Sequence, residues 1–155
     1  MHIRRLRSAV GVAFATLAIL VGVGNAPAHA ISWPINDTVA VEKDMGVPSS
    51  APPGSAVCST LTFIYAHACF VQDGDYLYVL DKRSDGHSAV ALWEDYTAND
   101  QLWRQGMCRN AEGEGHWVRC NKNFYESHTL ALSEGQAEGW RLLNFYGSFR
   151  WITVA

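Results

Sequence analysis

The stretch that decides the fold runs from Gly74 to Trp93 and has the sequence GDYLYVLDKRSDGHSAVALW. It contains two short apolar runs, Tyr76–Leu80 and Ala89–Trp93, on either side of Ser84-Asp85-Gly86. Short aromatic and aliphatic runs bounded by Gly, Asp and Ser are typical of β-strands. The Ser-Asp-Gly turn signal therefore predicts a hairpin between them. Because Tyr76–Leu80 is apolar at both odd and even positions, we expect it to be a central strand.

Similar short apolar runs, separated by turn residues, fill most of the chain after Val57. They are Leu61–Tyr65, Ala68–Gln72, Leu102–Cys108, His116–Cys120, Leu130–Ser133, Trp140–Phe145 and Phe149–Val154. None of these runs keeps the apolar repeat of an amphipathic helix. We therefore predict an all-β fold with roughly seven to nine strands. A small antiparallel β-sandwich is the first choice, and a partly open barrel is the alternative.

Residues 1–30 have the layout of a secretory signal peptide. Three arginines precede an apolar run from Ala9 to Gly24, and Ala28-His29-Ala30 offers the small residues that signal peptidase requires. The apolar run is shorter than the ~20 residues that span a bilayer. We therefore expect cleavage after Ala30, secretion to the extracellular space, and no membrane attachment afterwards.

The charge of the remaining chain is acidic. The 155 residues carry a net charge of −3, and residues 1–30 hold three arginines and no acidic residue, so the rest carries −6. Phosphate backbones repel such a chain, so we expect no nucleic-acid partner.

The prolines divide the secreted part into two regions. Four of the five prolines of the chain lie within residues 31–56, and none follows Val57. We predict a Pro/Ser-containing N-terminal spacer at 31–56 and a β domain at 57–155. An ordered arm that packs against the domain is the alternative for residues 31–56.

Four cysteines, an even number, lie in the predicted β domain. In an exported chain this predicts two disulfides, for which three pairings are possible. We favour the sequential pairing Cys58–Cys69 and Cys108–Cys120, in which each bond bridges two strands of a hairpin. Each bond closes a short loop and contributes on the order of 2–3 kcal/mol. The spacing lacks a C-x-x-C pair, so it does not favour zinc, and we predict no metal site.

Aromatic residues serve mainly as core in this interpretation, because so short a domain needs their buried area. Some lie at predicted strand ends or beside turns, where an exposed ring can stack on a sugar or anchor a protein. The candidates for ligand binding are Trp93, Tyr96, Trp103 and Trp117.

Catalytic and metal-binding alternatives are weaker. His87, Ser88 and Asp81 or Asp85 contain the residue types of a catalytic triad, but no nucleophile motif surrounds the serine. Four aspartates around two turns could bind calcium, although Asp before Gly is also ordinary turn chemistry. These are Asp73, Asp75, Asp81 and Asp85. We predict no catalytic residue and no cofactor.

One resemblance rests on a series of short matches between Cys58 and Cys120. They are ACFVQDGDYLYVLD at 68–81, DGHSAVA at 85–91, Cys108-Arg109-Asn110, GEGHW at 113–117 and Cys120-Asn121. In these segments the chain resembles uncharacterised small secreted proteins of Streptomyces-type actinomycetes. The resemblance implies secretion and a disulfide-stapled β domain, and it implies no activity, ligand or catalytic residue.

These features together predict a secreted, non-enzymatic binding module. Its expected ligand is an extracellular protein or a cell-wall carbohydrate, bound by exposed aromatic side chains. A secreted inhibitor or antagonistic effector is the alternative, with the loop from Arg109 to Arg119 inserted into a target. A small hydrolase is the third possibility.

Overall fold

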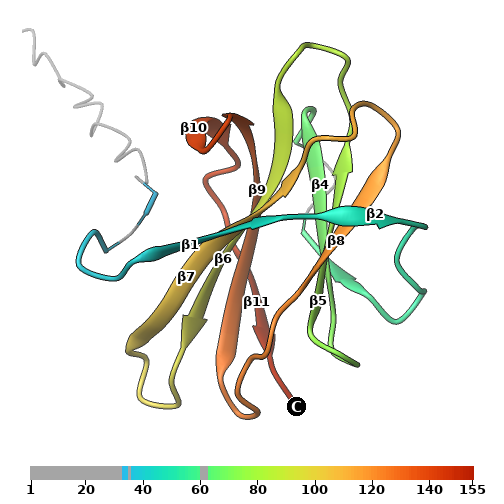
Figure 1. Ribbon diagram of the computed structural model, residues 1–155. Coiled ribbons are helices and arrows are strands. Elements are labelled where there is room, and N and C mark those ends of the chain that lie inside the picture. Colours follow the sequence, from blue (N-terminus) through green and yellow to red (C-terminus); the bar gives the residue numbers. More distant parts are fainter. Residues whose placement is uncertain (1–32, 35, 60–62) are drawn as a thin grey trace, which may run out of the picture.

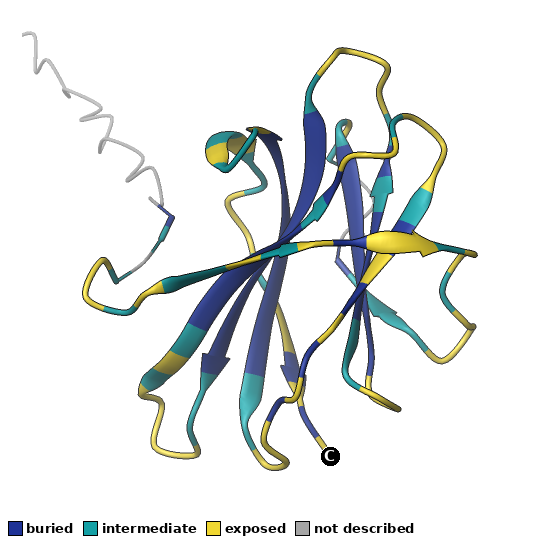
Figure 2. Ribbon diagram, in the orientation of Figure 1, coloured by how far each residue is buried: buried dark blue, intermediate teal, exposed yellow. Residues whose placement is uncertain are grey.

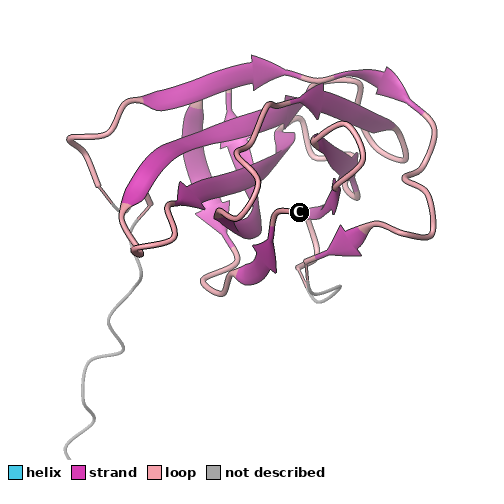
Figure 3. Ribbon diagram, turned by 90° about the horizontal axis from the view of Figure 1, so that it is seen from below, coloured by secondary structure: helices cyan, strands magenta, loops and turns pink. Residues whose placement is uncertain are grey.

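The computed structural model describes residues 33, 34, 36–59 and 63–155, which form strands and loops (Figures 1 and 3). The strands are β1 (Val41–Met45), β2 (Val47–Ser49), β3 (Val57–Cys58), β4 (Ala66–Val71), β5 (Tyr76–Asp81), β6 (Ser88–Tyr96), β7 (Leu102–Asn110), β8 (Trp117–Asn121), β9 (Thr129–Glu138), β10 (Arg141–Phe145) and β11 (Arg150–Thr153). The predicted signal peptide at 1–30 lies outside the described residues.

The strands form two sheets that pack face to face. The β6 sheet has the order β1-β7-β6-β9-β10, with β11 also paired to β9, and the β5 sheet has the order β2-β8-β5-β4-β3. Every pairing is antiparallel except that of β1 with β7. The predicted β-sandwich is confirmed, and the sheets do not close into a barrel.

The core lies between the two sheets and follows the two-residue repeat of the strands. In β6, Ala89, Ala91 and Trp93 point into this core, while Val90 and Leu92 point to the opposite face of the sheet. That opposite face is covered in turn by a second apolar cluster, which includes Trp33, Trp140 and Leu142. β6 and β9 are therefore buried on both faces, as the dark ribbons of Figure 2 show.

The hairpin predicted at Ser84-Asp85-Gly86 is wrong. β5 belongs to one sheet and β6 to the other, so the chain crosses between the sheets at this point. Gly86 has a φ of 79°, which fits its predicted place in a turn. The turn signal fixes a reversal of the chain but not the strand that pairs, and β6 pairs with β7 and β9 instead.

The spacer predicted at 31–56 is also wrong in its central part. β1 pairs with β7 of one sheet, and β2 pairs with β8 of the other. The chain passes between the sheets at Gly46, whose N–H donates to the Arg109 carbonyl at 2.9 Å. The alternative of an ordered arm is correct for this segment, and the domain begins before residue 57. Backbone pairing outweighs the scarcity of apolar side chains here.

Both predicted disulfides are present, Cys58–Cys69 and Cys108–Cys120. Cys58 and Cys69 are direct cross-strand partners in β3 and β4, as expected. Cys108 lies in β7 and Cys120 in β8, which belong to different sheets. The second bond therefore joins the two layers of the sandwich, and not the two strands of one hairpin as predicted.

Most other predicted strands are confirmed with shifted ends. The exception is Leu61–Tyr65, because residues 63–65 are not in a strand and residues 60–62 lie outside the described chain. At the C-terminal end, β10 and β11 pair in succession with the same edge of β9. Tyr146, between them, keeps the contact through its N–H, which donates to the Glu134 carbonyl at 2.8 Å.

Two glutamates are fully buried in the β6 sheet. Glu134 in β9 lies on the same face as Leu132, toward the core, and Glu94 in β6 lies on the same face as Leu92. Burial disfavours the charged carboxylate and raises the pKa of each glutamate to about 7. Both carboxyl groups are thus neutral in mildly acidic solution.

The sheet crossing at Gly46 leaves no room for a residue larger than glycine. A Cβ at this position would lie 2.7 Å from the Val118 Cβ, inside the core. We expect Gly46→Ala to lower the free energy of unfolding by about 1–3 kcal/mol, measured by urea denaturation. Gly54→Ala is the matched control, since its Cβ would meet nothing within 4 Å, and we expect a change within about 0.5 kcal/mol. Equal effects of the two substitutions would contradict the crossing.

The buried glutamates predict a pH dependence of stability. Their pKa in the folded chain, about 7, exceeds the ordinary value of 4.5. The contribution of each neutral glutamate to the free energy of unfolding is therefore fully present below the ordinary pKa. It is lost as the pH rises toward 7, by roughly 3 kcal/mol for each group. Urea denaturation across this range should show Glu94→Gln and Glu134→Gln each with a flatter pH dependence. The exposed Glu112→Gln should keep the wild-type slope, and wild-type slopes in both buried variants would disprove the assignment.

Candidate functional site

The candidate site is a shallow hollow of about 200 Å³ lined by Thr97, Trp103, Tyr125 and His128, called the aromatic hollow below. Its residues come from the β6–β7 hairpin and from the loop between β8 and β9. Trp103 and Tyr125 are 54% and 58% exposed, whereas most aromatic rings in the described chain are at least partly buried. Two large rings thus face solvent around one hollow.

A β-bulge places Trp103 at the hollow. In the β6–β7 pairing, Asp95 faces Arg104 and Tyr96 faces Leu102, so Trp103 has no partner on β6. A bulge leaves one residue unpaired and redirects its side chain. This irregularity leaves Trp103, the second residue of β7, without a neighbour on β6.

The hairpin turn that follows β6 is fixed by Thr97. Its Oγ1 accepts hydrogen bonds from the N–H groups of Asn99 and Gln101, at 3.4 and 3.3 Å. Asp100 has a φ of 56°, a conformation that Asp adopts more readily than most residues. These two hydrogen bonds therefore fix the position of Thr97, which lines the hollow.

The loop that carries Tyr125 is tied to the C-terminal segment. The N–H of Ser127 donates to the Val154 carbonyl at 2.8 Å, and the N–H of Val154 donates to the His128 carbonyl at 2.9 Å. The Tyr125 ring lies 5.3 Å from the His128 ring, between centroids. These contacts hold the two side chains of the loop beside each other.

His128 is oriented by a buried carboxylate. Its Nδ1 lies 2.8 Å from Oδ1 of Asp95, whose side chain is completely buried. Burial raises the pKa of Asp95, and the hydrogen bond and charge of His128 act in the opposite direction. The contact with Asp95 therefore fixes the orientation of the His128 ring at the hollow.

Charged residues reinforce the floor behind the hollow. Arg104 makes a two-pronged ion pair with Glu42 of β1, at 2.7 and 3.0 Å, which lowers the pKa of Glu42 to about 2. Lys122 contacts Glu42 at 2.9 Å and also Asp44. The three elements β1, β7 and the β8–β9 loop are thereby joined at this end of the sandwich.

Trp93 belongs to this floor, so its prediction as an exposed ligand-binding residue is wrong. It is 0% exposed, with Lys122 Nζ 4.6 Å and Arg104 Cζ 5.4 Å from its ring. β6 continues three residues beyond the predicted end, which places Trp93 within the strand and facing the core. Its cation–π contacts support the site from behind.

The other two predicted residues lie away from the hollow. Tyr96 is half-buried on the outer face of the β6 sheet, where its hydroxyl donates to Glu94 Oε2 at 2.9 Å and its ring lies 5.4 Å from Trp151. Trp117 is half-buried in β8, with its ring 6.0 Å from that of His67. Trp103 is therefore the one predicted residue that lines the hollow. Tyr125 and His128 were missed, because they lie in a loop whose sequence has no periodic signal.

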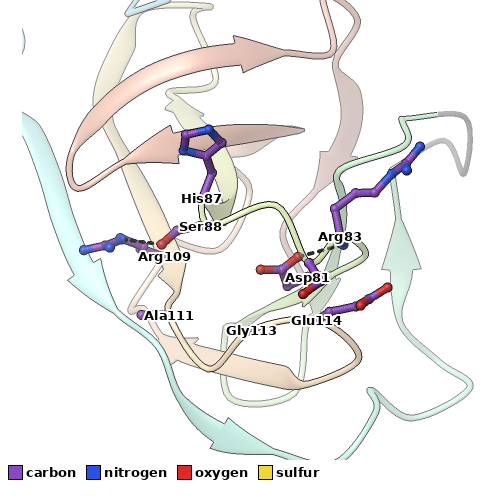
Figure 4. A pocket seen from close by; sticks show the side chains of 10 residues that line it. Asp81, Arg83, His87, Ser88, Arg109, Ala111, Gly113 and Glu114 are labelled. Atoms are coloured by element: carbon purple, nitrogen blue, oxygen red, sulfur yellow. Dashed lines mark hydrogen bonds between the residues drawn. The ribbon is translucent and has the colours of Figure 1, made fainter.

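A second, polar pocket of about 390 Å³ lies between the β5–β6 and β7–β8 loops (Figure 4). Ser88 Oγ accepts a hydrogen bond from Arg109 Nε at 2.9 Å, and Asp81 Oδ1 accepts one from the N–H of Arg83 at 2.9 Å. His87 Nδ1 lies 3.0 Å from Glu138. The hypothetical triad of His87, Ser88 and Asp81 or Asp85 is not assembled, since a nucleophile requires its base within hydrogen-bonding reach. Asp85 accepts hydrogen bonds from the backbone N–H of His87 and from Gln136 Nε2 instead.

The four aspartates considered for calcium do not form one site. Asp73 and Asp75 lie at the β4–β5 turn, whereas Asp81 is the last residue of β5 and Asp85 lies in the loop that follows it. A six-residue strand separates the two pairs by roughly 17–20 Å. Within the described ranges, the one group of three possible metal ligands is Cys58, His67 and Cys69.

The described chain contains no helix that is long and apolar enough to cross a bilayer. Its two disulfides are consistent with an oxidising environment. Comparisons with protein-family models, with curated proteins and with solved structures find no match to this chain.

Proposed function

We propose that this protein is a secreted, non-enzymatic module that binds a carbohydrate at the aromatic hollow. The observation that carries the proposal is the pair of exposed rings, Trp103 and Tyr125, beside an imidazole held by a buried carboxylate. The C–H faces of a sugar ring stack on aromatic planes. The lining of the hollow that solvent can reach is almost wholly apolar, so the hollow offers a stacking surface for such a ring.

The size of the hollow suits a small ligand. About 200 Å³ accommodates a small ring system such as one sugar. The rings also sit on a rigid support, because ion pairs and the Asp95–His128 contact hold the surrounding elements. A preorganised site loses less conformational freedom when it binds.

The same lining supports binding without catalysis. Hydrolysis of a glycosidic bond ordinarily uses two carboxyl groups that flank the bond. The four residues that line the hollow include no carboxylate, and the nearby Asp95 is buried behind His128.

Export is part of the proposal. It is supported by the signal-peptide layout of residues 1–30 and by the two disulfides. The resemblance to small secreted actinomycete proteins implies the same location. A secreted, acidic module of this kind is suited to a neutral or cationic carbohydrate surface more than to a nucleic acid.

Binding to insoluble polysaccharides tests the proposal. We expect the protein to co-sediment with at least one of three probes, namely peptidoglycan, chitin or cellulose. Trp103→Ala and Tyr125→Ala should each weaken that binding by about thirtyfold, the equivalent of roughly 2 kcal/mol for a central aromatic contact. Trp151→Ala is the control, because Trp151 is 58% exposed but does not line the hollow.

Circular dichroism should show that all three variants keep the wild-type fold. Retention on none of the probes would contradict a cell-wall carbohydrate ligand. Equal losses for Trp151→Ala and Trp103→Ala would remove the hollow as the binding site.

A further inference from the structure

The edge of the β5 sheet brings two cysteines and a histidine together. Cys58 in β3 lies directly opposite Cys69 in β4, and His67 precedes Cys69 by two residues, so the three side chains share one face of the sheet. Their sulfur and nitrogen atoms all lie within 4.8 Å of one another. His67 Nε2 lies 3.6 Å from Cys69 Sγ.

While the disulfide is intact, the two nitrogens of the His67 imidazole make few polar contacts. His67 is 8% exposed and its Nδ1 is buried without a hydrogen-bond partner. The neighbour of Nε2 is a disulfide sulfur, which is a weak acceptor. Burial and, to a smaller extent, the charge of Lys82 lower the pKa of His67. A buried polar ring with so few partners requires an explanation.

We propose that the Cys58–Cys69 pair, once reduced, forms a zinc site with His67. A dithiol or phosphine reductant supplies the two electrons that break the S–S bond, and each cysteine becomes a thiol. Zn²⁺ then binds both sulfurs and one imidazole nitrogen, and the two thiol protons are released to solvent. Two thiolates and one imidazole are a ligand set that zinc prefers, with a water as the fourth ligand.

The setting of β3 allows this change. β3 has two residues and pairs with β4 alone, so Cys58 can withdraw from Cys69 with the loss of few backbone contacts. Cys58 is also half-buried, which gives a reductant access to the bond. Every chain passes through the thiol form before its disulfides close, so the site belongs to that stage and to any later reduction.

The other disulfide is the internal comparison. Cys108 and Cys120 lie in different sheets and are 0% and 4% exposed. Among the described residues, no histidine joins them in a group of three possible ligands. Zinc binding is therefore specific to the first pair.

Cobalt binding to the reduced protein tests the inference. After treatment with a phosphine and titration with Co²⁺, we expect a thiolate-to-cobalt charge-transfer band that one equivalent of Zn²⁺ abolishes. The oxidised protein should show no such band. His67→Ala should weaken Co²⁺ binding by about tenfold or more through the loss of one ligand, and Cys58→Ser/Cys69→Ser should abolish it.

His116→Ala is the matched control, because His116 is exposed and lies outside the site. His67→Asn provides a second variant if His67→Ala loses its fold by circular dichroism. Absence of the band in reduced wild-type protein would overturn the proposal. An unchanged affinity in the folded His67 variant would do the same, as would a band of full strength in Cys58→Ser/Cys69→Ser.

Discussion

The enclosure of Trp93 between two cations and the core is the interaction on which the rest of this structure depends. Its ring fills the inter-sheet space at one end of the sandwich, 5.2 Å from the Phe124 ring. Arg104 and Lys122 lie over the same ring, and both reach Glu42 of β1. A buried aromatic ring thus binds two basic side chains that would otherwise be costly to desolvate.

This arrangement links the fold to the candidate site. Arg104 follows the bulged Trp103 directly, and Lys122 begins the loop that carries Tyr125 and His128. The ion pairs that hold the Trp93 ring therefore also set the positions of the exposed rings. Asp95, two residues after Trp93 and on the same face, extends the same polar floor to His128. Core packing and the geometry of the hollow depend on the same few contacts.

The sandwich is connected in a way that makes its two layers interdependent. The chain crosses between the sheets after β5, after β7 and after β8, and β1 and β2 add a further crossing at Gly46. The Cys108–Cys120 bond joins the layers covalently. The pairings of β1 with β7, β2 with β8, β5 with β8 and β6 with β9 join strands distant in sequence, whereas β3–β4, β4–β5, β6–β7 and β9–β10 join consecutive strands.

The fold class, most strands and the number of disulfides followed from the sequence, because strand periodicity and the parity of cysteines are local or countable properties. The sequential pairing was favoured among three possibilities, and the structure confirms it. Residues Tyr76–Leu80 are in fact a central strand, with β4 on one side and β8 on the other. The partners of β6, the sheet crossing at Gly46 and the burial of Trp93 were decided by the tertiary structure. A turn signal does not tell which strands pair with each other. Whether a side chain such as Trp93 reaches solvent depends on where its strand ends, which the sequence alone did not fix. Trp103 was predicted because it lies near the end of a strand. Tyr125 and His128 were not predicted, because their loop meets Trp103 only in the folded chain.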